Sequence, residues 1–303
     1  MSEAIDNSST QRAHANGSKK PRVLCVGAGG AKAGLVVPEL VKRGAFVRGM
    51  IDNDNQRQAV SEKGADEVVV GSLTDIAFVE EAVAGVDAVF YISPNGLQDE
   101  AAAGKALVDV AKRAGVGRIV FSSIFAPILS IPIHAAKAAV EEAILRSGLE
   151  YTILQPAMFY QNLTGMWDEL LRTGTYAEPW SNDARLGRVD YRDVAECAAV
   201  ALTGDRLLAG TFQLCAIESI DRNEIAALIG RITGRTVKPV ALDADEAAKS
   251  AGPAAPVLSS MFKYYGRYGL PGNTLALRTI LGREPRTLQQ FIEELAVGSH
   301  ASA

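Results

Sequence analysis

The chain has 303 residues, 48% of them hydrophobic and 22% charged, so it can bury one large core or two unequal ones. A formal net charge of -4 and scattered lysines and arginines disfavour nucleic-acid binding. Three separated cysteines and three histidines form no disulfide or metal pattern, and no apolar run is long enough to span a bilayer. We therefore expect a cytoplasmic protein with reduced thiols and no membrane partner.

Residues 1–20 are polar and are predicted to form a disordered tail. From Pro21, short β-branched runs alternate with longer amphipathic stretches, which is typical of a parallel sheet covered by helices on both faces. Because such crossovers are right-handed, we expect a doubly wound, Rossmann-type α/β fold. The expected strands are Arg22–Val26, Phe46–Ile51, Val68–Val70, Ala88–Ile92, Arg118–Ser122 and Tyr151–Gln155. The expected helices are Gly34–Arg43, Asn55–Lys63, Ile76–Ala84, Glu100–Ala114 and His134–Arg146.

The alternation loosens after Pro156, where glycines and prolines become frequent. We expect residues 21–156 to form a dinucleotide-binding domain, to which later segments can return. Residues 157–296 then form a smaller α+β lobe for a substrate or partner, and 297–303 a flexible tail. Capping boxes at Asp221 with Glu224, and at Thr287 with Gln290, predict helix starts in this lobe.

A glycine-rich segment, "GAGGAKAG" from Gly27 to Gly34, lies directly between a predicted strand and a predicted helix. Its small residues at Gly27, Gly30 and Ala33 fit the pattern G-x-x-G-x-x-A. Such a turn lets backbone N–H groups approach a pyrophosphate. The alternative is a tight turn that binds no ligand.

Asp52 ends the second predicted strand, where a carboxylate can accept hydrogen bonds from an adenosine ribose diol. It would repel a 2′-phosphate, so the sequence favours NAD(H). NADP(H) remains an alternative because Lys32, Arg48 and Arg57 could supply opposing charge. The run "DNDN" from Asp52 can also cap the following helix.

Several further segments follow one another as in a known family. They are "GSLTD" from Gly71, "VFYISPN" from Val89, "IVFSS" from Ile119, "HAAKAAVEEAILRSGLEYTILQPAMFYQN" from His134, "GRVDYRDVAECAA" from Gly187 and "GREPRTLQQF" from Gly282. Together with the glycine turn, they resemble the NmrA-like branch of the atypical short-chain dehydrogenases/reductases. The chain departs from the family pattern at Ala33 and Ser72, and it has Asp52 where many relatives have arginine.

The resemblance implies that a nicotinamide dinucleotide is held by the glycine turn and by loops at the carboxyl ends of the strands. By motif position, the residues implied are Gly27, Ala28, Gly29, Gly30, Ala31, Lys32, Ala33, Asp52, Ser72, Leu73, Ser93, Pro94, Asn95, Ser122, Lys137, Pro156, Ala157, Met158 and Phe159.

The tyrosine that short-chain reductases use as a proton donor is absent, because Ile133 stands four residues before Lys137. Lys137 can still hydrogen-bond the nicotinamide ribose. His134 can donate a proton or simply line the helix start. Tyr160 and Tyr91, expected near the mouth of the site, are alternative donors or aromatic walls.

Two functions fit these features. The first is an NAD(P)H-dependent reductase that transfers hydride to a quinone, azo compound or enone, whose delocalised product anion needs no dedicated tyrosine. The second is a non-enzymatic redox sensor that binds dinucleotide and acts through a protein partner. Asp190 and Asp193 are expected to cap a helix, and "FKYYGRYG" from Phe262 fits a pocket lid or a partner surface equally well.

Overall fold

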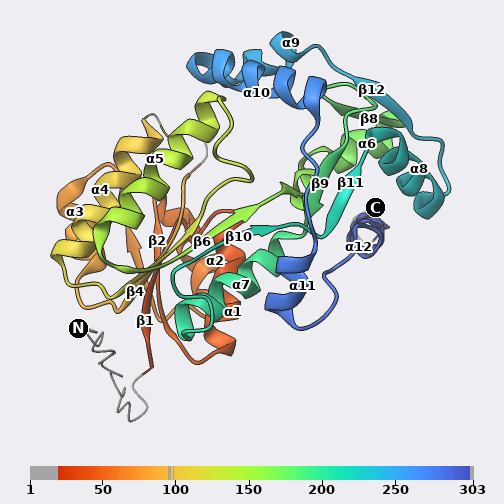
Figure 1. Ribbon diagram of the computed structural model, residues 1–303. Coiled ribbons are helices and arrows are strands. Elements are labelled where there is room, and N and C mark those ends of the chain that lie inside the picture. The colour runs from red at the N-terminus through yellow and green to blue at the C-terminus, as the bar shows by residue number, and fades with distance from the viewer. Residues whose placement is uncertain (1–19, 95–96, 98, 301–303) are drawn as a thin grey trace, which may run out of the picture.

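The computed structural model describes residues 20–94, 97 and 99–300, and centres on a parallel seven-stranded sheet (Figure 1). The strand order is β3-β2-β1-β4-β5-β6-β10, which confirms the doubly wound Rossmann-type fold. The strands are β1 (Arg22–Val26), β2 (Phe46–Ile51), β3 (Glu67–Val70), β4 (Ala88–Ile92), β5 (Arg118–Ser122), β6 (Glu150–Pro156) and β10 (Gly210–Leu214). All the neighbouring pairs are parallel.

Helices cover both faces of this sheet. One face carries α3 (Ile76–Val83), α4 (Glu100–Arg113) and α5 (Pro132–Ser147), and the other α1 (Val36–Lys42), α2 (Arg57–Glu62) and α7 (Tyr191–Thr203). Short 3-10 helices, η1 (Ala33–Leu35) and η2 (Asp54–Gln56), precede α1 and α2. The expected helix 34–43 thus begins with a 3-10 turn, directly after the glycine-rich segment.

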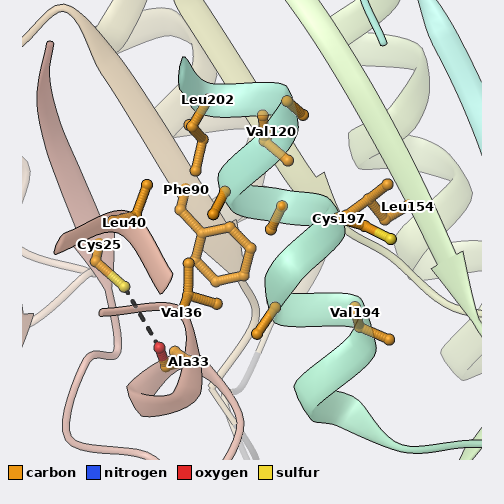
Figure 2. Close-up of a cluster of buried hydrophobic side chains, with 14 of the residues drawn as sticks. Cys25, Ala33, Val36, Leu40, Phe90, Val120, Leu154, Val194, Cys197 and Leu202 are labelled. Atoms are coloured by element: carbon orange, nitrogen blue, oxygen red, sulfur yellow. Dashed lines mark hydrogen bonds between the residues drawn. The ribbon is translucent and has the colours of Figure 1, made fainter. Parts of the chain in front are cut away.

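The core on the α1 and α7 face explains why the strands have continuous apolar sequences rather than alternating ones. Cys25 of β1 and Phe90 of β4 point into the same cluster as Leu40 of α1 and Val194 and Cys197 of α7 (Figure 2). The intervening strand residues pack against α3, α4 and α5 on the opposite face. Because both faces are buried, every strand position favours an apolar side chain.

The remaining elements form a smaller lobe at the carboxyl ends of the strands (Figure 1). Its strands are β7 (Met158–Phe159), β9 (Leu186–Val189) and β11 (Ile217–Ile220) in one sheet, and β8 (Thr175–Glu178) and β12 (Lys238–Ala241) in another. Its helices are η3 (Tyr160–Asn162), η4 (Thr164–Met166), α6 (Trp167–Thr173), α8 (Arg222–Thr233), α9 (Ala244–Ala248), η5 (Lys249–Ala254), α10 (Ala255–Tyr268) and α12 (Leu288–His300).

The chain crosses between the two parts more than once. After β6 it enters the lobe through β7, and it later returns to the large sheet through α7 and β10. Helix α11 (Leu275–Leu281) also packs on the sheet, since Leu277 and Ile280 belong to the same core as α1 and α7. The large sheet is therefore completed by segments that follow residue 156.

A buried ion cluster joins the strands and the helix of the lobe. The Glu178 carboxylate accepts hydrogen bonds from Nη2 of Arg188 at 2.9 and 3.1 Å, and Nε of Arg222 lies 3.7 Å from it. All three side chains are almost completely buried. Arg222 also donates to the carbonyls of Trp180 and Val240 at 2.8 and 2.9 Å. The cluster thereby fixes β8, β9 and α8 relative to one another.

Both predicted capping boxes are present. Asp221 and Glu224 bond reciprocally at the start of α8, as do Thr287 and Gln290 before α12. Asp190 caps α7, as expected, by accepting from the Arg192 backbone N–H. Asp193 has a different role from the expected cap, because its buried carboxylate bonds Arg283 and Arg286 of the C-terminal segment.

Candidate functional site

A cavity of about 270 Å³ opens at the carboxyl ends of β1, β2 and β4. This is the switch point of the strand order, where open α/β sheets bind ligands. Nine of the predicted residues line it: Gly27, Gly30, Ala31, Lys32, Ala33, Asp52, Leu73, Ser93 and Pro94. Sequence reasoning missed six more: Val26, Met50, Ile51, Gln56, Gly71 and Ile92.

The glycine turn forms the floor of this cavity. Gly27 has a φ of +72°, which favours glycine, and its carbonyl accepts from the Gly30 N–H at 2.8 Å. A Cβ atom on Gly30 would lie 3.2 Å from that carbonyl, and one on Gly29 would lie 2.1 Å from Oε1 of Gln56. Gln56 therefore covers Gly29, whereas Gly27 and Gly30 line the cavity without side chains, so that their backbone is open to a pyrophosphate and fits a dinucleotide.

Asp52 provides the negative charge at the β2 end of the cavity. Its side chain is exposed, directly after the last residue of β2. The two arginines that could offset this charge have other partners. Arg48 bonds Glu67 at 2.6 Å and the Ala82 carbonyl at 2.8 Å, and Arg57 pairs with Asp54 at 2.7 Å.

Gln56 reaches the cavity from η2, the short helix that follows Asp52. The sequence offers one signal for it, since the "DNDN" run predicts a tight turn that brings the next residues back over the glycine segment. Ser72 behaves differently from its neighbour Leu73. Its hydroxyl lies 2.7 Å from that of Thr74 and is exposed, outside the cavity lining.

The remaining predicted cofactor residues do not line this cavity. Ala28 is buried beneath the turn, and Gly29 lies under Gln56. Ser122 is fully buried and its Oγ accepts a hydrogen bond from the Tyr191 hydroxyl at 2.9 Å. Asn95 lies outside the described residues.

Residues 156–159 form the junction between the large sheet and the lobe. Pro156 and Ala157 are buried at the end of β6, and Met158 packs with the residues around α10. The Phe159 ring stands edge-on to Tyr191, with centroids 5.0 Å apart. The Nζ atom of Lys32 lies 5.7 Å from the Phe159 centroid, so this junction contacts the glycine turn.

Lys137 is the lysine that the motif places on the cofactor, and an acidic side chain pairs with it. Its ammonium forms an ion pair with Glu100 at the start of α4, and the two side chains are 11% and 16% exposed. Burial lowers the pKa of Lys137, and the neighbouring Glu100 carboxylate opposes this shift. The pair joins α4 to α5 beside the carboxyl ends of β4 and β5.

His134 is fully buried and has a partner on each ring nitrogen. Nδ1 lies 3.0 Å from the Ala126 carbonyl, and Nε2 lies 2.8 Å from the Tyr265 hydroxyl. A carbonyl can only accept, so Nδ1 carries the proton and Nε2 accepts from Tyr265. Burial also lowers the pKa of His134, which favours this neutral form. His134 therefore links α5 to α10 and has no proton directed at the cavity.

The two tyrosines expected near the mouth are not there. Tyr91 is fully buried and stacks on Phe121 with centroids 5.1 Å apart. Tyr160 is fully buried in the core of the lobe against Phe291. Burial raises the pKa of both hydroxyls well above their usual range. The expectation was wrong because both rings pack into hydrophobic cores, Tyr91 into that of the large sheet and Tyr160 into that of the lobe.

Within residues 20–94, 97 and 99–300, no helix is both long and apolar enough to cross a bilayer. The same residues contain no group of three or more histidine, cysteine or acidic side chains that could hold a metal ion.

The sheet topology and the cavity at its switch point define a Rossmann-type protein with a glycine turn at the floor of the cavity. The chain belongs to the NmrA-like family, whose model matches residues 19–294.

Two curated relatives match nearly the full chain. It is 24% identical to the NAD(P)H azoreductase of Xenophilus azovorans, over 93% of this chain and 98% of that protein. It is 29% identical to the (4-alkanoyl-5-oxo-2,5-dihydrofuran-3-yl)methyl phosphate reductase of Streptomyces griseus, over 90% and 98%. Among solved structures, the negative transcriptional regulator NmrA in complex with NAD has a TM-score of 0.76 and 18% identity, covering 94% of this chain and 98% of that one. It shares the fold.

Proposed function

We propose that the chain is an NAD(P)H-dependent reductase that transfers hydride to a conjugated acceptor such as a quinone, an azo compound or an enone. The observation that carries the proposal is the cavity at the switch point, with Gly27 and Gly30 at its floor and Asp52 at its β2 end. The two full-length relatives, named as reductases of an azo compound and of an unsaturated furanone, support the class of acceptor.

The strand order gives the proposed orientation of the cofactor. Asp52 would hold the adenosine ribose at the end of β2, Gly27 and Gly30 would hold the pyrophosphate, and Ser93 and Lys137 would hold the nicotinamide side near β4 and β5. When bound in the reduced form, the cofactor supplies a hydride. We propose that Lys137, which has three N–H donors and shares one with Glu100, also bonds the nicotinamide ribose hydroxyls.

Residues 156–159 are proposed to close the nicotinamide end, and the lobe to provide the acceptor side. The contact between Lys32 and Phe159 supports this placement, because it brings the junction onto the glycine turn.

We further propose a preference for NAD(H) over NADP(H). The Asp52 carboxylate can accept hydrogen bonds from both ribose hydroxyls, and a 2′-phosphate would lie against it. The engagement of Arg48 with Glu67, and of Arg57 with Asp54, supports the same preference.

Calorimetric titration with NAD+, NADH, NADP+ and NADPH tests this proposal, using the natural chain and Asp52→Ala. Asp109→Ala is the matched control, because Asp109 is also exposed but lies on α4, outside the cavity lining. We expect tighter binding of the unphosphorylated pair, and Asp52→Ala should remove the preference while Asp109→Ala retains it. Binding of none of the four would contradict a dinucleotide function.

A dinucleotide sensor acting through a protein partner is the second candidate. His134 and Tyr160 are fully buried, and Ile133 stands where short-chain reductases have their tyrosine. These three positions therefore supply no proton donor to the cavity, which favours a sensor. The fold shared with NmrA is compatible with it. Steady-state assays with azo dyes, quinones and unsaturated lactones distinguish the two. A sensor binds oxidised and reduced dinucleotides with different affinities and shows no turnover, whereas a reductase oxidises NADH when an acceptor is present.

A further inference from the structure

A positive group near the acceptor would accelerate the reaction proposed above. Hydride addition to a conjugated acceptor leaves a negative charge on an oxygen or nitrogen, and a fixed cation stabilises that charge. The expected proton donors do not face the cavity. The ring nitrogens of His134 are both engaged, and Tyr160 is buried in the lobe core.

Lys32 has the properties that these residues lack. It lines the cavity, and with Asp52 it is one of two charged residues among the described ones that do so. Its Nζ lies 5.7 Å from the centroid of the Phe159 ring. In the part of the chain that the structure describes, no carboxylate pairs with it, and burial lowers the pKa of its ammonium.

The direction of the Lys32 side chain places its charge on the acceptor side. Asp52 follows β2, on one side of β1, whereas Phe159 follows β6, on the other side of β1 beyond β4 and β5. The Lys32 amine, lying against Phe159, is therefore directed away from the adenosine end and toward the lobe. The other charged group of the cavity, Asp52, stands at the opposite end.

We propose that Lys32 is a catalytic residue that stabilises the anion formed on the acceptor and donates the proton that completes its reduction. The proposal rests on the proposed reductase function. The acceptor gains a hydride, with its two electrons, from the reduced dinucleotide and a proton from the Lys32 ammonium. The N–H bond of Lys32 breaks as the new O–H or N–H bond of the product forms, and water then returns a proton to the amine.

The competing role for Lys32 is to neutralise a phosphate of the cofactor. Equilibrium binding separates the two roles without turnover. The probes are NAD+, NADPH and 2-hydroxy-1,4-naphthoquinone, whose 2-hydroxyl group is ionised at neutral pH. The variants are Lys32→Met, which removes the charge, and Lys32→Arg, which keeps the charge but does not release a proton readily. Lys42→Met is the matched control, because Lys42 is an exposed lysine of α1 paired with Glu39.

We expect Lys32→Met to bind NAD+ within about threefold of the natural chain and to bind the naphthoquinone anion, in the presence of NAD+, at least about tenfold more weakly. Lys32→Arg should retain binding of this anion. In turnover with a neutral quinone, both Lys32 variants should lose about 100-fold in kcat/KM, the usual contribution of a positioned general acid. In the natural chain kcat/KM should decrease at high pH as the Lys32 ammonium loses its proton, and this decrease should be absent in both Lys32 variants. Lys42→Met should match the natural chain in every assay.

A second readout follows the Lys32 ammonium directly. After reductive methylation with 13C-formaldehyde, the Lys32 signal is identified by its absence in Lys32→Met. Its pKa should lie below the ordinary lysine value and rise when the naphthoquinone anion binds.

Four results would overturn the assignment. Weaker binding of NAD+ by Lys32→Met, by tenfold or more, would assign Lys32 to the pyrophosphate, and a loss confined to NADPH would assign it to a 2′-phosphate. Unchanged anion binding and an unchanged pH profile would refute the role while the reductase function stands. If the natural chain binds dinucleotide but reduces no acceptor, the reductase function fails, and the role of Lys32 as a proton donor fails with it.

Discussion

Replacing Glu100 by glutamine measures how much the ion pair with Lys137 contributes to the stability of the fold. The side chains of Lys137 and Glu100 are 11% and 16% exposed, so both charged groups are largely desolvated. Removing one partner of a buried pair costs about 3 kcal/mol or more, because the other charge stays buried without compensation. We expect Glu100→Gln to lose about 3 kcal/mol in the free energy of unfolding at pH 7.

The loss should depend on pH in a definite direction. Burial lowers the pKa of Lys137 in the folded state, and Glu100 opposes that shift. Without Glu100, the pKa of Lys137 in the folded chain falls further. At any pH between this lowered pKa and the ordinary lysine pKa, the unfolded chain binds more protons than the folded one. Stability therefore rises with pH through that window, and the deficit of Glu100→Gln should shrink as the pH approaches the ordinary lysine range.

Urea unfolding at pH 7 and pH 9.5 measures both effects. Glu246→Gln is the matched control, since its exposed pair with Lys249 should contribute less than about 1 kcal/mol. The double variant Glu100→Gln/Lys137→Met should recover much of the loss, because it removes the buried charge as well. A loss for Glu100→Gln equal to that of Glu246→Gln, or one that grows with pH, would refute the reasoning.

Three further outcomes follow from the geometry. Glu178→Gln leaves two buried arginines without a carboxylate and should cost about 3–5 kcal/mol, measured by urea unfolding. Ser122→Ala should cost about 1–3 kcal/mol of unfolding free energy, because it leaves the buried Tyr191 hydroxyl unpaired. NADH affinity should stay within about threefold, and a much larger loss of affinity would place Ser122 on the cofactor. Gly27→Ala strains a positive φ and should destabilise the fold by about 1 kcal/mol and weaken calorimetric NADH binding, whereas unchanged affinity would exclude the turn from the site.

The first half of the fold followed from the sequence because its signals are local. A β-branched run, a glycine turn and an amphipathic helix each depend on residues close in the chain, and the strands expected from Arg22 to Gln155 are present with boundaries within two residues. The cavity lining at Gly27, Gly30 and Asp52 was predictable for the same reason, since strand ends in a parallel sheet meet at one edge.

Side-chain partners were not predictable in this way. The sequence suggested His134 as a donor, but Tyr265, 131 residues away, occupies its Nε2. Lys137 was identified without its partner Glu100, and Tyr160 was expected at the mouth but lies inside the lobe core. The return of α7 and β10 to the large sheet was left open because no local pattern states which strand a segment pairs with.

The sequence by itself determined the Rossmann-type fold and the glycine turn, since each depends on short-range periodicity and on residues that a tight turn requires, and its motifs carried the resemblance to the family. Only the tertiary structure decided which charged and polar groups remain available for chemistry. Burial and long-range pairing engage His134 and Lys137 and remove Tyr160 from the site, but leave Lys32 in the cavity, and those effects depend on contacts between segments that are distant along the chain.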